Sequence, residues 1–332
     1  MARSWTADEL LEEVRGFQGA CVIAAAVELD VITVLTDKPV TADVLAGRIG
    51  SDPRATTVLL DALVAMELLT KQGDTYHVPS DVAELLAADS RTNVLSGVRH
   101  LANCLRRWGQ LGRVVKTGQP AEATPSIRGQ AGDCEAFIGA MDDFSAATAP
   151  RLIERLSPLR FQRLLDIGGA SGTWTIAFLR AVPDATAVLF DQPQVIPLAR
   201  ERLADAGLID RVTLVAGDFY SDPLPGGADF AWLSAIAHQN SRQQNRNLYA
   251  KVYTALAAGG VLAIRDVVMD DSRTRPAAGA MFAVNMLVGT EGGSTFTLSE
   301  FTEDLKAAGF SDVRLVHRDP SMSSLIVAKR GR

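Results

Sequence analysis

Short apolar runs recur along the second half of the chain and alternate with stretches of helical apolar spacing. The helical stretches include Thr173–Leu179, Pro193–Ala206 and Ser241–Leu256. Alternating strands and helices are typical of a parallel sheet with right-handed crossovers. Two final runs predict a terminal hairpin that adds an antiparallel strand. The expected fold class is α/β, with a doubly wound, mostly parallel sheet of seven strands at Leu164–Ile167, Thr186–Phe190, Val212–Ala216, Phe230–Ser234, Val261–Arg265, Val313–Val316 and Leu325–Ala328.

The first half has a different pattern. Leu10–Leu35 carries apolar residues at helical spacing, with small residues between them that allow a second helix to approach. Thr41 and Gly50 have the residue types of an N-cap and a C-terminal stop, and Asp52-Pro53 opens a helix over 54–69. Residues 68–78 then predict a hairpin with its turn at Gly73-Asp74. Helix, turn, helix and a two-stranded wing together indicate a winged helix.

Charge decides between two uses of such a domain. Residues 1–90 hold 15 acidic and 6 basic side chains, the opposite of a phosphate-facing surface. We interpret 1–105 as a dimerisation domain for a second copy of the chain, with DNA binding as the minor alternative. Residues 106–332 form the second domain, in which 106–160 is a helical connector. Two domains suit a chain of 332 residues.

The amino-acid composition indicates which partners and which cellular compartment to expect. The chain is 47% hydrophobic and 22% charged, with a net charge of −6, which argues against a nucleic-acid partner. Cys21, Cys104 and Cys134 are widely spaced and are interpreted as reduced core residues of a cytoplasmic protein. The N-terminus lacks the apolar region of a signal peptide, and no apolar run reaches membrane-spanning length. Four histidines and no C-x-x-C make a metal site improbable.

The stretch from Leu164 to Gly172 is the strongest candidate for a binding site. An apolar run ends in Asp166, and a glycine-rich turn, Gly168-Gly169-Ala170-Ser171-Gly172, follows. A dinucleotide fingerprint would need glycine at 170 and 173, and a P-loop would need a lysine after the glycines. An acid before the turn favours a cationic ligand over a pyrophosphate. S-adenosylmethionine (SAM), which carries a sulfonium and an ammonium group, fits, although a tight structural turn fits equally well.

Ligands of an open α/β sheet bind outside the carboxyl ends of its strands. Asp191 follows the second strand, and its spacing along the sequence from Gly168 suits an acid that accepts from the ribose hydroxyls. Gln192 is next to it. Asp218 and Phe219 follow the third strand, where a carboxylate accepts from an adenine amino group and an aromatic ring packs on the base. Ser234 and then His238 follow the fourth. Each acid alone could be a helix N-cap, Asp191 before Pro193 above all.

These motifs resemble the class I SAM-dependent small-molecule O-methyltransferases, of the plant caffeate and bacterial secondary-metabolite types. The resemblance spans nearly the whole chain. The segments that carry it are D-I-G-G-A-S-G, F-D-Q-P, G-D-F, L-S-A-I-A-H, A-A-G-G-V-L-A-I-R-D, E-G-G-S-T-F-T and E-D-L-K-A-A-G-F. It implies an N-terminal winged-helix dimerisation domain, a C-terminal SAM domain and cofactor contacts from Gly168, Asp191, Gln192, Asp218, Phe219 and Ser234. Asp166, Gly169 and Gly172 of the acidic, glycine-rich turn are further candidates for cofactor binding.

The resemblance places His238 where the family keeps its general base. Asp266, after the fifth strand, matches a position that usually holds glutamate and flanks that histidine. A histidine suits removal of a hydroxyl proton near neutral pH, and a carboxylate behind the ring would set its tautomer. The plainer interpretation is that His238 merely precedes a helix, since Ser241 and Gln244 form a capping box.

Two departures from the family pattern concern the base. Gln239-Asn240 replace the usual Asp-Trp, and Thr295 stands where the family has a second glutamate, for which Glu291 is a nearby substitute. C-methylation of an enol, or SAM binding without methylation, therefore stay open as alternatives. Outside the family, an NAD-type oxidoreductase and a winged-helix regulator with a SAM sensor are weaker alternatives. Candidate lining residues for a flat, largely apolar acceptor are Trp108, Phe137, Met141, Met281, Asn285 and Met286.

Overall fold

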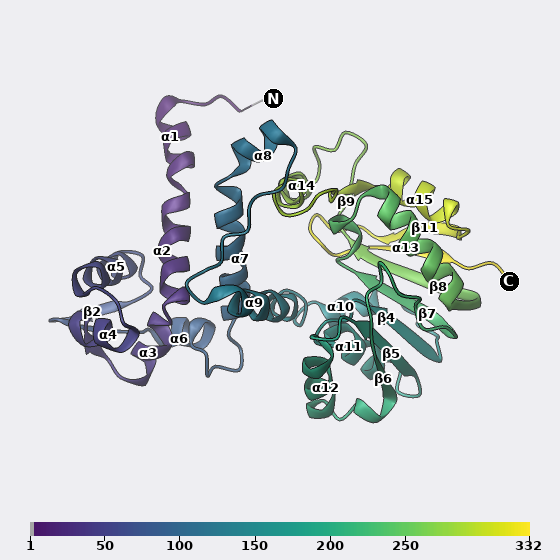
Figure 1. Cartoon of the computed structure of the whole chain (residues 1–332), viewed down its shortest axis with the longest axis horizontal. Coiled ribbons are helices and arrows are strands. Elements are labelled where there is room, and N and C mark those ends of the chain that lie inside the picture. Colours follow the sequence, from purple (N-terminus) through teal and green to yellow (C-terminus); the bar gives the residue numbers. More distant parts are fainter. Residues whose placement is uncertain (1–2) are drawn as a thin grey trace. The chain divides into compact units, whose positions relative to one another are not determined.

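The computed structural model describes residues 3–332, and these form two compact units. The first unit comprises residues up to Arg106 together with 124–143, and the second comprises 107–123 and 144–332. Residues of the predicted connector at 106–160 thus contribute to both units. Figure 1 labels the elements of each.

The first unit begins with three helices, α1 (Ala7–Arg15), α2 (Phe17–Glu28) and α3 (Val31–Asp37). The apolar pattern predicted one helical region, and the chain breaks it at Gly16, between α1 and α2, and again at Asp30, whose backbone is left-handed with φ of +56°. A left-handed residue cannot continue a right-handed helix. Within the described residues no single helix is long and apolar enough to span a membrane. The pair Ala7–Glu28 and Val31–Asp37, bent by 56° at the break between them, reaches that length and apolar composition only when both are taken together.

The predicted helix, turn, helix and hairpin are all present. They correspond to α4 (Ala42–Ile49), α5 (Pro53–Ala65), β2 (Thr70–Gln72) and β3 (Thr75–His77), and β1 (Val40–Thr41) pairs with β3 as a third strand. Asp52 caps α5 by accepting from the Ala55 amide at 2.8 Å. Thr41 is the N-cap residue of α4 and Gly50, with φ of +67°, is its C-cap, as predicted, although the Thr41 side chain makes no capping hydrogen bond.

The remaining helices of the first unit are α6 (Ser80–Leu86), most of α7 (Leu95–Trp108) and α9 (Gly129–Asp143). Arg99 of α7 and Arg128 both bind the Asp30 carboxylate. The cysteine prediction needs correction, because Cys21 on α2 and Cys134 on α9 are exposed and Cys104 is only half-buried. None of the three forms a disulfide within residues 3–332. A cysteine is small enough to lie on an exposed helix face where another element packs closely, so its residue type does not require burial in the core.

The second unit contains the predicted seven-stranded sheet, in the order β11-β12-β8-β7-β4-β5-β6. Neighbours β8-β7-β4-β5-β6 are parallel, whereas β12 pairs antiparallel with both β8 and β11. The α/β, mostly parallel fold is confirmed. Its strands are β4 (Arg163–Ile167), β5 (Thr186–Asp191), β6 (Val212–Ala216), β7 (Ala228–Ser234), β8 (Leu256–Asp266), β11 (Ser311–His317) and β12 (Ser324–Lys329).

Helices cover both faces of this sheet (Figure 1). On one face α11 (Thr173–Ala181), α12 (Ile196–Asp205) and α10 (Ala149–Glu154) bury a core that includes Phe178 and Trp232. On the other, α13 (Arg242–Ala255) and α15 (Leu298–Ala307) bury a second core that includes Tyr249 and Phe301. Residues on alternate positions of each strand supply the two cores, as the period of two requires.

Smaller elements complete the second unit. They are α8 (Leu111–Thr117), the 3₁₀ turns η1 (Ile209–Arg211) and η2 (Ala237–Gln239), α14 (Ala277–Gly289), and the parallel pair β9 (Val268–Met269) and β10 (Phe296–Thr297). The helix predicted from Pro193 begins only at Ile196, and Asp191 does not cap it. The capping box of Ser241 and Gln244 at the start of α13 is confirmed.

Candidate active site

The turn after β4 has the backbone of a tight loop. Gly168, Ala170 and Gly172 all have positive φ, at +67°, +47° and +85°. A Cβ on Gly169 would lie 2.6 Å from Cγ of Leu189 and 3.0 Å from the carboxyl carbon of Asp166. Close packing therefore requires glycine at 169, and the left-handed backbone favours it at 168 and 172. So little side-chain bulk lets the main chain approach a ligand, which fits an adenosyl cofactor.

Asp166 lies beneath this loop. It is 1% exposed, and the Thr175 hydroxyl on α11 donates to its Oδ2 at 2.6 Å. Burial raises the pKa of Asp166 to about 7, and the charge of Asp191 acts in the same direction. The geometry gives Asp166 a role in joining the loop to α11, and its direct contact with a cofactor stays a prediction.

Asp191 closes the loop from the neighbouring strand. Its two carboxylate oxygens accept from the backbone N–H groups of Ala170 and Gln192, each at 2.7 Å. Burial raises the pKa of Asp191, while these two donors oppose the shift. Gln192 itself is exposed. The acid at the end of β5 is thus held beside the glycine turn.

The loop after β6 reaches the same place. The Phe219 ring lies 3.8 Å from the position that a Cβ on Gly168 would take, so the two loops converge. Asp218 accepts from the Tyr220 N–H, and its own N–H donates to Asp222, both at 2.8 Å. Asp218 and Phe219 are half-buried. The sheet therefore gathers the residues that follow β4, β5 and β6 at its carboxyl edge, as the strand order predicted.

A buried cation lies near the end of β7. Nη1 of Arg265 on β8 donates to the Ser234 hydroxyl at 3.2 Å, and the guanidinium lies 5.0 Å from the Trp174 ring centroid. Burial lowers the pKa of Arg265 to about 10, against the attraction of Asp266 and Asp319. Sequence reasoning missed Arg265. The signal was a charged residue at the end of the apolar run Val261–Ile264.

His238 is in η2, immediately after β7. Its Nδ1 lies 3.0 Å from Oδ1 of Asp266, and the His238 backbone N–H donates to Oδ2 at 3.2 Å. The Val267 N–H also donates to Oδ1, at 2.8 Å. A carboxylate oxygen accepts, so this contact favours the tautomer in which Nδ1 carries the proton and Nε2 keeps its lone pair. Both residues are buried, at 8% and 2% exposed. The Asp266 carboxylate therefore holds the orientation of the imidazole ring.

Thr295 is 2% exposed, and its hydroxyl donates to the Gly279 carbonyl at 3.3 Å. The segment around it packs on the histidine turn through its backbone, since the Ser294 N–H donates to the His238 carbonyl at 2.8 Å. Glu291 is exposed at the start of this segment. In the described chain, Asp266 is the carboxylate that binds the His238 ring.

Helix α14 supplies most of the predicted pocket residues of the second unit. The Phe282 ring stands edge-on to His238, with centroids 4.8 Å apart. One turn further along, Oδ1 of Asn285 accepts from Trp108 Nε1 at 2.8 Å. Met281 is 57% exposed, whereas Met286 is 9% exposed and belongs to the core.

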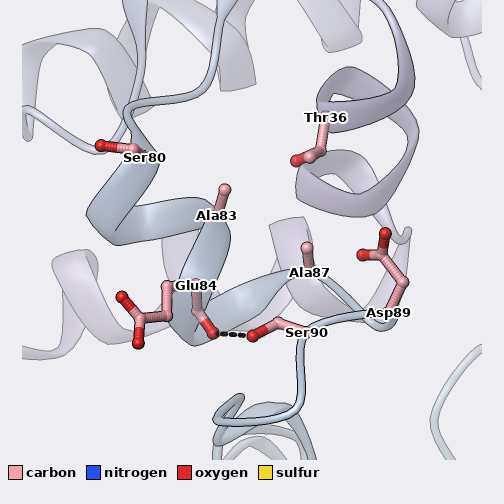
Figure 2. A pocket seen from close by; sticks show the side chains of 7 residues that line it. All are labelled: Thr36, Ser80, Ala83, Glu84, Ala87, Asp89 and Ser90. Carbon is pink, nitrogen blue, oxygen red and sulfur yellow. Dashed lines mark hydrogen bonds between the residues drawn. The ribbon is translucent and has the colours of Figure 1, made fainter.

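Phe137 and Met141 are on α9 in the first unit. The Phe137 and His100 rings pack in a T-shaped arrangement, with centroids 5.2 Å apart. That unit also has a shallow hollow, in which the Ser90 hydroxyl donates to the Glu84 carbonyl at 2.6 Å (Figure 2). None of the predicted site residues lines this hollow, which is formed by Thr36, Ser80, Ala83, Glu84, Ala87, Asp89 and Ser90.

Comparison with known proteins places this geometry in a family. Residues 125–311 match the O-methyltransferase domain and residues 11–89 the O-methyltransferase dimerisation domain. The chain therefore belongs to the SAM-dependent O-methyltransferases, enzymes that act on small molecules with SAM as the methyl donor.

Two relatives are from Streptomyces. The tetracenomycin polyketide synthesis 8-O-methyl transferase TcmO of Streptomyces glaucescens is 32% identical over 92% of each chain. The 3-hydroxy-5-methyl-1-naphthoate 3-O-methyltransferase of Streptomyces sahachiroi is 31% identical over 89% of this chain and 86% of its own. Among solved structures, PigF with SAH is similar at a TM-score of 0.84 and 25% identity, covering 98% of this chain and all of PigF.

Proposed function

We propose that this methyltransferase methylates a hydroxyl oxygen of a small aromatic or polyketide-like molecule, with His238 as general base and Asp266 as its positioning residue. The observation that carries the proposal is the 3.0 Å contact from His238 Nδ1 to Asp266 Oδ1. It leaves Nε2 as the basic atom, at the carboxyl edge of the sheet. A buried carboxylate with three N–H partners holds the ring orientation and stabilises the imidazolium that forms.

When bound, SAM supplies a methyl group on a sulfonium sulfur, and that sulfur keeps the electron pair of the broken S–C bond in the product S-adenosylhomocysteine (SAH). The protein must align the acceptor oxygen with that bond at about 3–3.5 Å from the methyl carbon. Nε2 of His238 takes the hydroxyl proton as the new O–C bond forms. The Asp266 carboxylate accepts from the ring and balances the charge that the ring acquires.

For the cofactor, we assign the glycines 168, 169 and 172 to close main-chain approach. Asp191 with Gln192 suits the ribose hydroxyls, because a carboxylate accepts from two neighbouring donors. Asp218 suits the adenine amino group, with the Phe219 ring packing on the base. Asp166 supports the glycine loop by binding Thr175 of α11. Ser234, the last residue of β7, is assigned to the part of SAM away from the adenosine. The convergence of the loops after β4, β5 and β6 supports these assignments.

Two observations support an aromatic or polyketide-like acceptor. Phe282 against His238, with Met281 and Asn285 on the same helix, offers apolar and aromatic surface beside the base. Trp108 stays a candidate for the rest of the pocket. Phe137 and Met141, in the first unit, stay predictions, whereas Met286 packs in the core. The printed names of the two Streptomyces relatives, a polyketide and a naphthoate enzyme, support a fused or single aromatic acceptor.

We also propose that the working form is a homodimer joined through the N-terminal domain, a winged helix used for protein contact. Helix α1 buries none of its residues within the chain. Leu10, Leu11, Val14 and Phe17 are each more than half exposed, which is unusual for a free surface. Light scattering at micromolar concentration should give twice the mass of the chain, and Val14→Glu should shift it to the monomer. A monomeric wild type would refute this part.

The experiment for the proposed function combines binding and product analysis. Calorimetry should show one SAH site per chain, and a screen of phenols, naphthols and enols with SAM should give a product methylated on oxygen. Mass spectrometry and NMR of the product distinguish an O-methyl from a C-methyl group. Absence of SAH binding, or a product methylated only on carbon, would contradict the proposal.

A further inference from the structure

A chain of polar side chains joins the loop after β6 to the turn that carries His238. The Tyr220 hydroxyl donates to Oδ1 of Asn240 at 2.5 Å. Nδ2 of Asn240 donates to Oδ1 of Asn245 at 3.0 Å, and Nδ2 of Asn245 donates to the Ala237 carbonyl at 2.9 Å. Asn240 and Asn245 are 0% and 1% exposed. Every donor in this chain points the same way, toward the residue before His238.

Both ends of this series of hydrogen bonds are held in place by further contacts. Asn245 lies in the first turn of α13, and Lys251 on the same helix donates to the carbonyls of Phe219, Tyr220 and Asp222 at 2.7–3.0 Å. Helix α13 therefore holds the loop at two places. Burial and the charge of Asp218 raise the pKa of Tyr220, so its hydroxyl stays protonated and able to donate at neutral pH.

The two segments that this chain joins have different tasks in the proposed function. One carries Asp218 and Phe219 for the adenine, and the other carries the base. Phe219 and Tyr220 are neighbours whose rings pack on each other, with centroids 4.5 Å apart. Asn240 also occupies the second of the two positions, 239 and 240, where this sequence departs from the Asp-Trp usual after the family's histidine. A small amide here accepts the tyrosine hydroxyl, which an indole could not do because it only donates.

We infer that Tyr220 and Asn240 are positioning residues that couple cofactor binding to the placement of His238, an inference that rests on the proposed function. Cofactor held by Phe219 fixes the Tyr220 ring, and the polar chain passes that order to the η2 turn. Fully satisfied buried polar networks give a single arrangement, and loss of one member leaves the others unpaired.

Tyr220→Phe tests the inference with the least disturbance, because it removes one oxygen from a side chain that is 46% exposed. Calorimetry with SAH should show Kd raised about 3- to 10-fold, the effect of one partly buried hydrogen bond. Asn240→Ala should raise it similarly, and the double variant should be no weaker than the worse single variant. The control is Tyr253→Phe, which removes a tyrosine hydroxyl elsewhere on α13 and should leave Kd unchanged.

Hydrogen exchange distinguishes coupling from a merely structural role. In wild type, SAH should slow amide exchange in both 168–176 and 236–245. In Tyr220→Phe, saturated with SAH, protection of 168–176 should persist and that of 236–245 should fall. If both segments stay protected and Kd is unchanged, the inference is wrong, whether or not thermal stability drops. If Asn240→Ala does not fold, Tyr220→Phe alone decides. Failure of wild type to bind SAH would instead refute the proposed function.

Discussion

Nδ1 of His238 lies 3.0 Å from Oδ1 of Asp266. Asp266 is the last residue of β8, and His238 is in the η2 turn that follows the adjacent strand β7. Ser234 pairs with Arg265 in the last register position of those strands, so the histidine turn begins directly beside the aspartate. The contact is thus a consequence of parallel pairing.

The first prediction concerns that carboxylate. Asp266→Asn should lower kcat by about 10²- to 10⁴-fold, because the amide removes the negative charge that fixes the tautomer and stabilises the imidazolium. Asp266→Glu should retain more activity than Asp266→Asn. Steady-state kinetics with saturating SAM measures both. Equal loss in the two variants would show that shape, and not charge, matters at this position.

The glycine loop gives a second prediction. Gly169→Ala places a methyl group 2.6 Å from Leu189 and 3.0 Å from the Asp166 carboxyl carbon, so the loop must shift. We expect a stability loss of about 1–3 kcal/mol and a loss of SAH affinity of at least 10-fold. Gly47→Ala on α4 is the control, because its Cβ meets nothing within 4 Å. Calorimetry and urea unfolding measure both effects, and an unchanged SAH affinity would contradict the assignment.

A third prediction follows from the buried acid beneath the loop. The folded pKa of Asp166 is about 7, above the unfolded value of about 3.9. The folded state therefore binds the proton more tightly, and this contribution is complete below pH 4 and lost as pH rises through 7. An asparagine side chain does not titrate, so the stability of Asp166→Asn relative to wild type should rise by about 1.4 kcal/mol per pH unit over that window. Urea unfolding at pH 5 and pH 7 tests it, and a pH-independent difference would contradict the burial argument.

Tyr249 supports a fourth prediction. The side chain is 1% exposed, and within residues 3–332 its hydroxyl has no hydrogen-bond partner. Burial of an unpaired hydroxyl is costly, so Tyr249→Phe should raise the free energy of unfolding by about 1 kcal/mol and Tm by about 2 °C. Differential scanning calorimetry measures the change. A destabilised variant would mean that the hydroxyl is paired after all.

Much of the fold was predictable because its signals are local. The strand runs, the glycine turn and the capping box are each written within a dozen residues, and all seven strands were found where the apolar runs lie. The helix break at Asp30 was missed, since a left-handed backbone at an aspartate leaves no apolar signature. The exposure of Cys21 and Cys134 was missed because residue type alone does not fix which helix face is covered.

The site was predictable only in part for a related reason. Asp191, Asp218, His238 and Asp266 follow strands, and parallel strands end at one edge. The partners that orient them are tertiary. Arg265 reaches Ser234 across 31 positions, and Tyr220 reaches Asn240 across 20. No local pattern records such pairs, and they appear only when the chain is folded.

The central claim is that His238 removes the acceptor's proton. The most direct measurement is the rate of methyl transfer by His238→Ala at saturating SAM, with the SAH dissociation constant of the same preparation. We expect transfer to fall by at least 10²-fold while SAH affinity changes less than about 3-fold. The control is His317→Ala on β11, at the opposite edge of the sheet from β6. Near-normal transfer by His238→Ala would contradict the account.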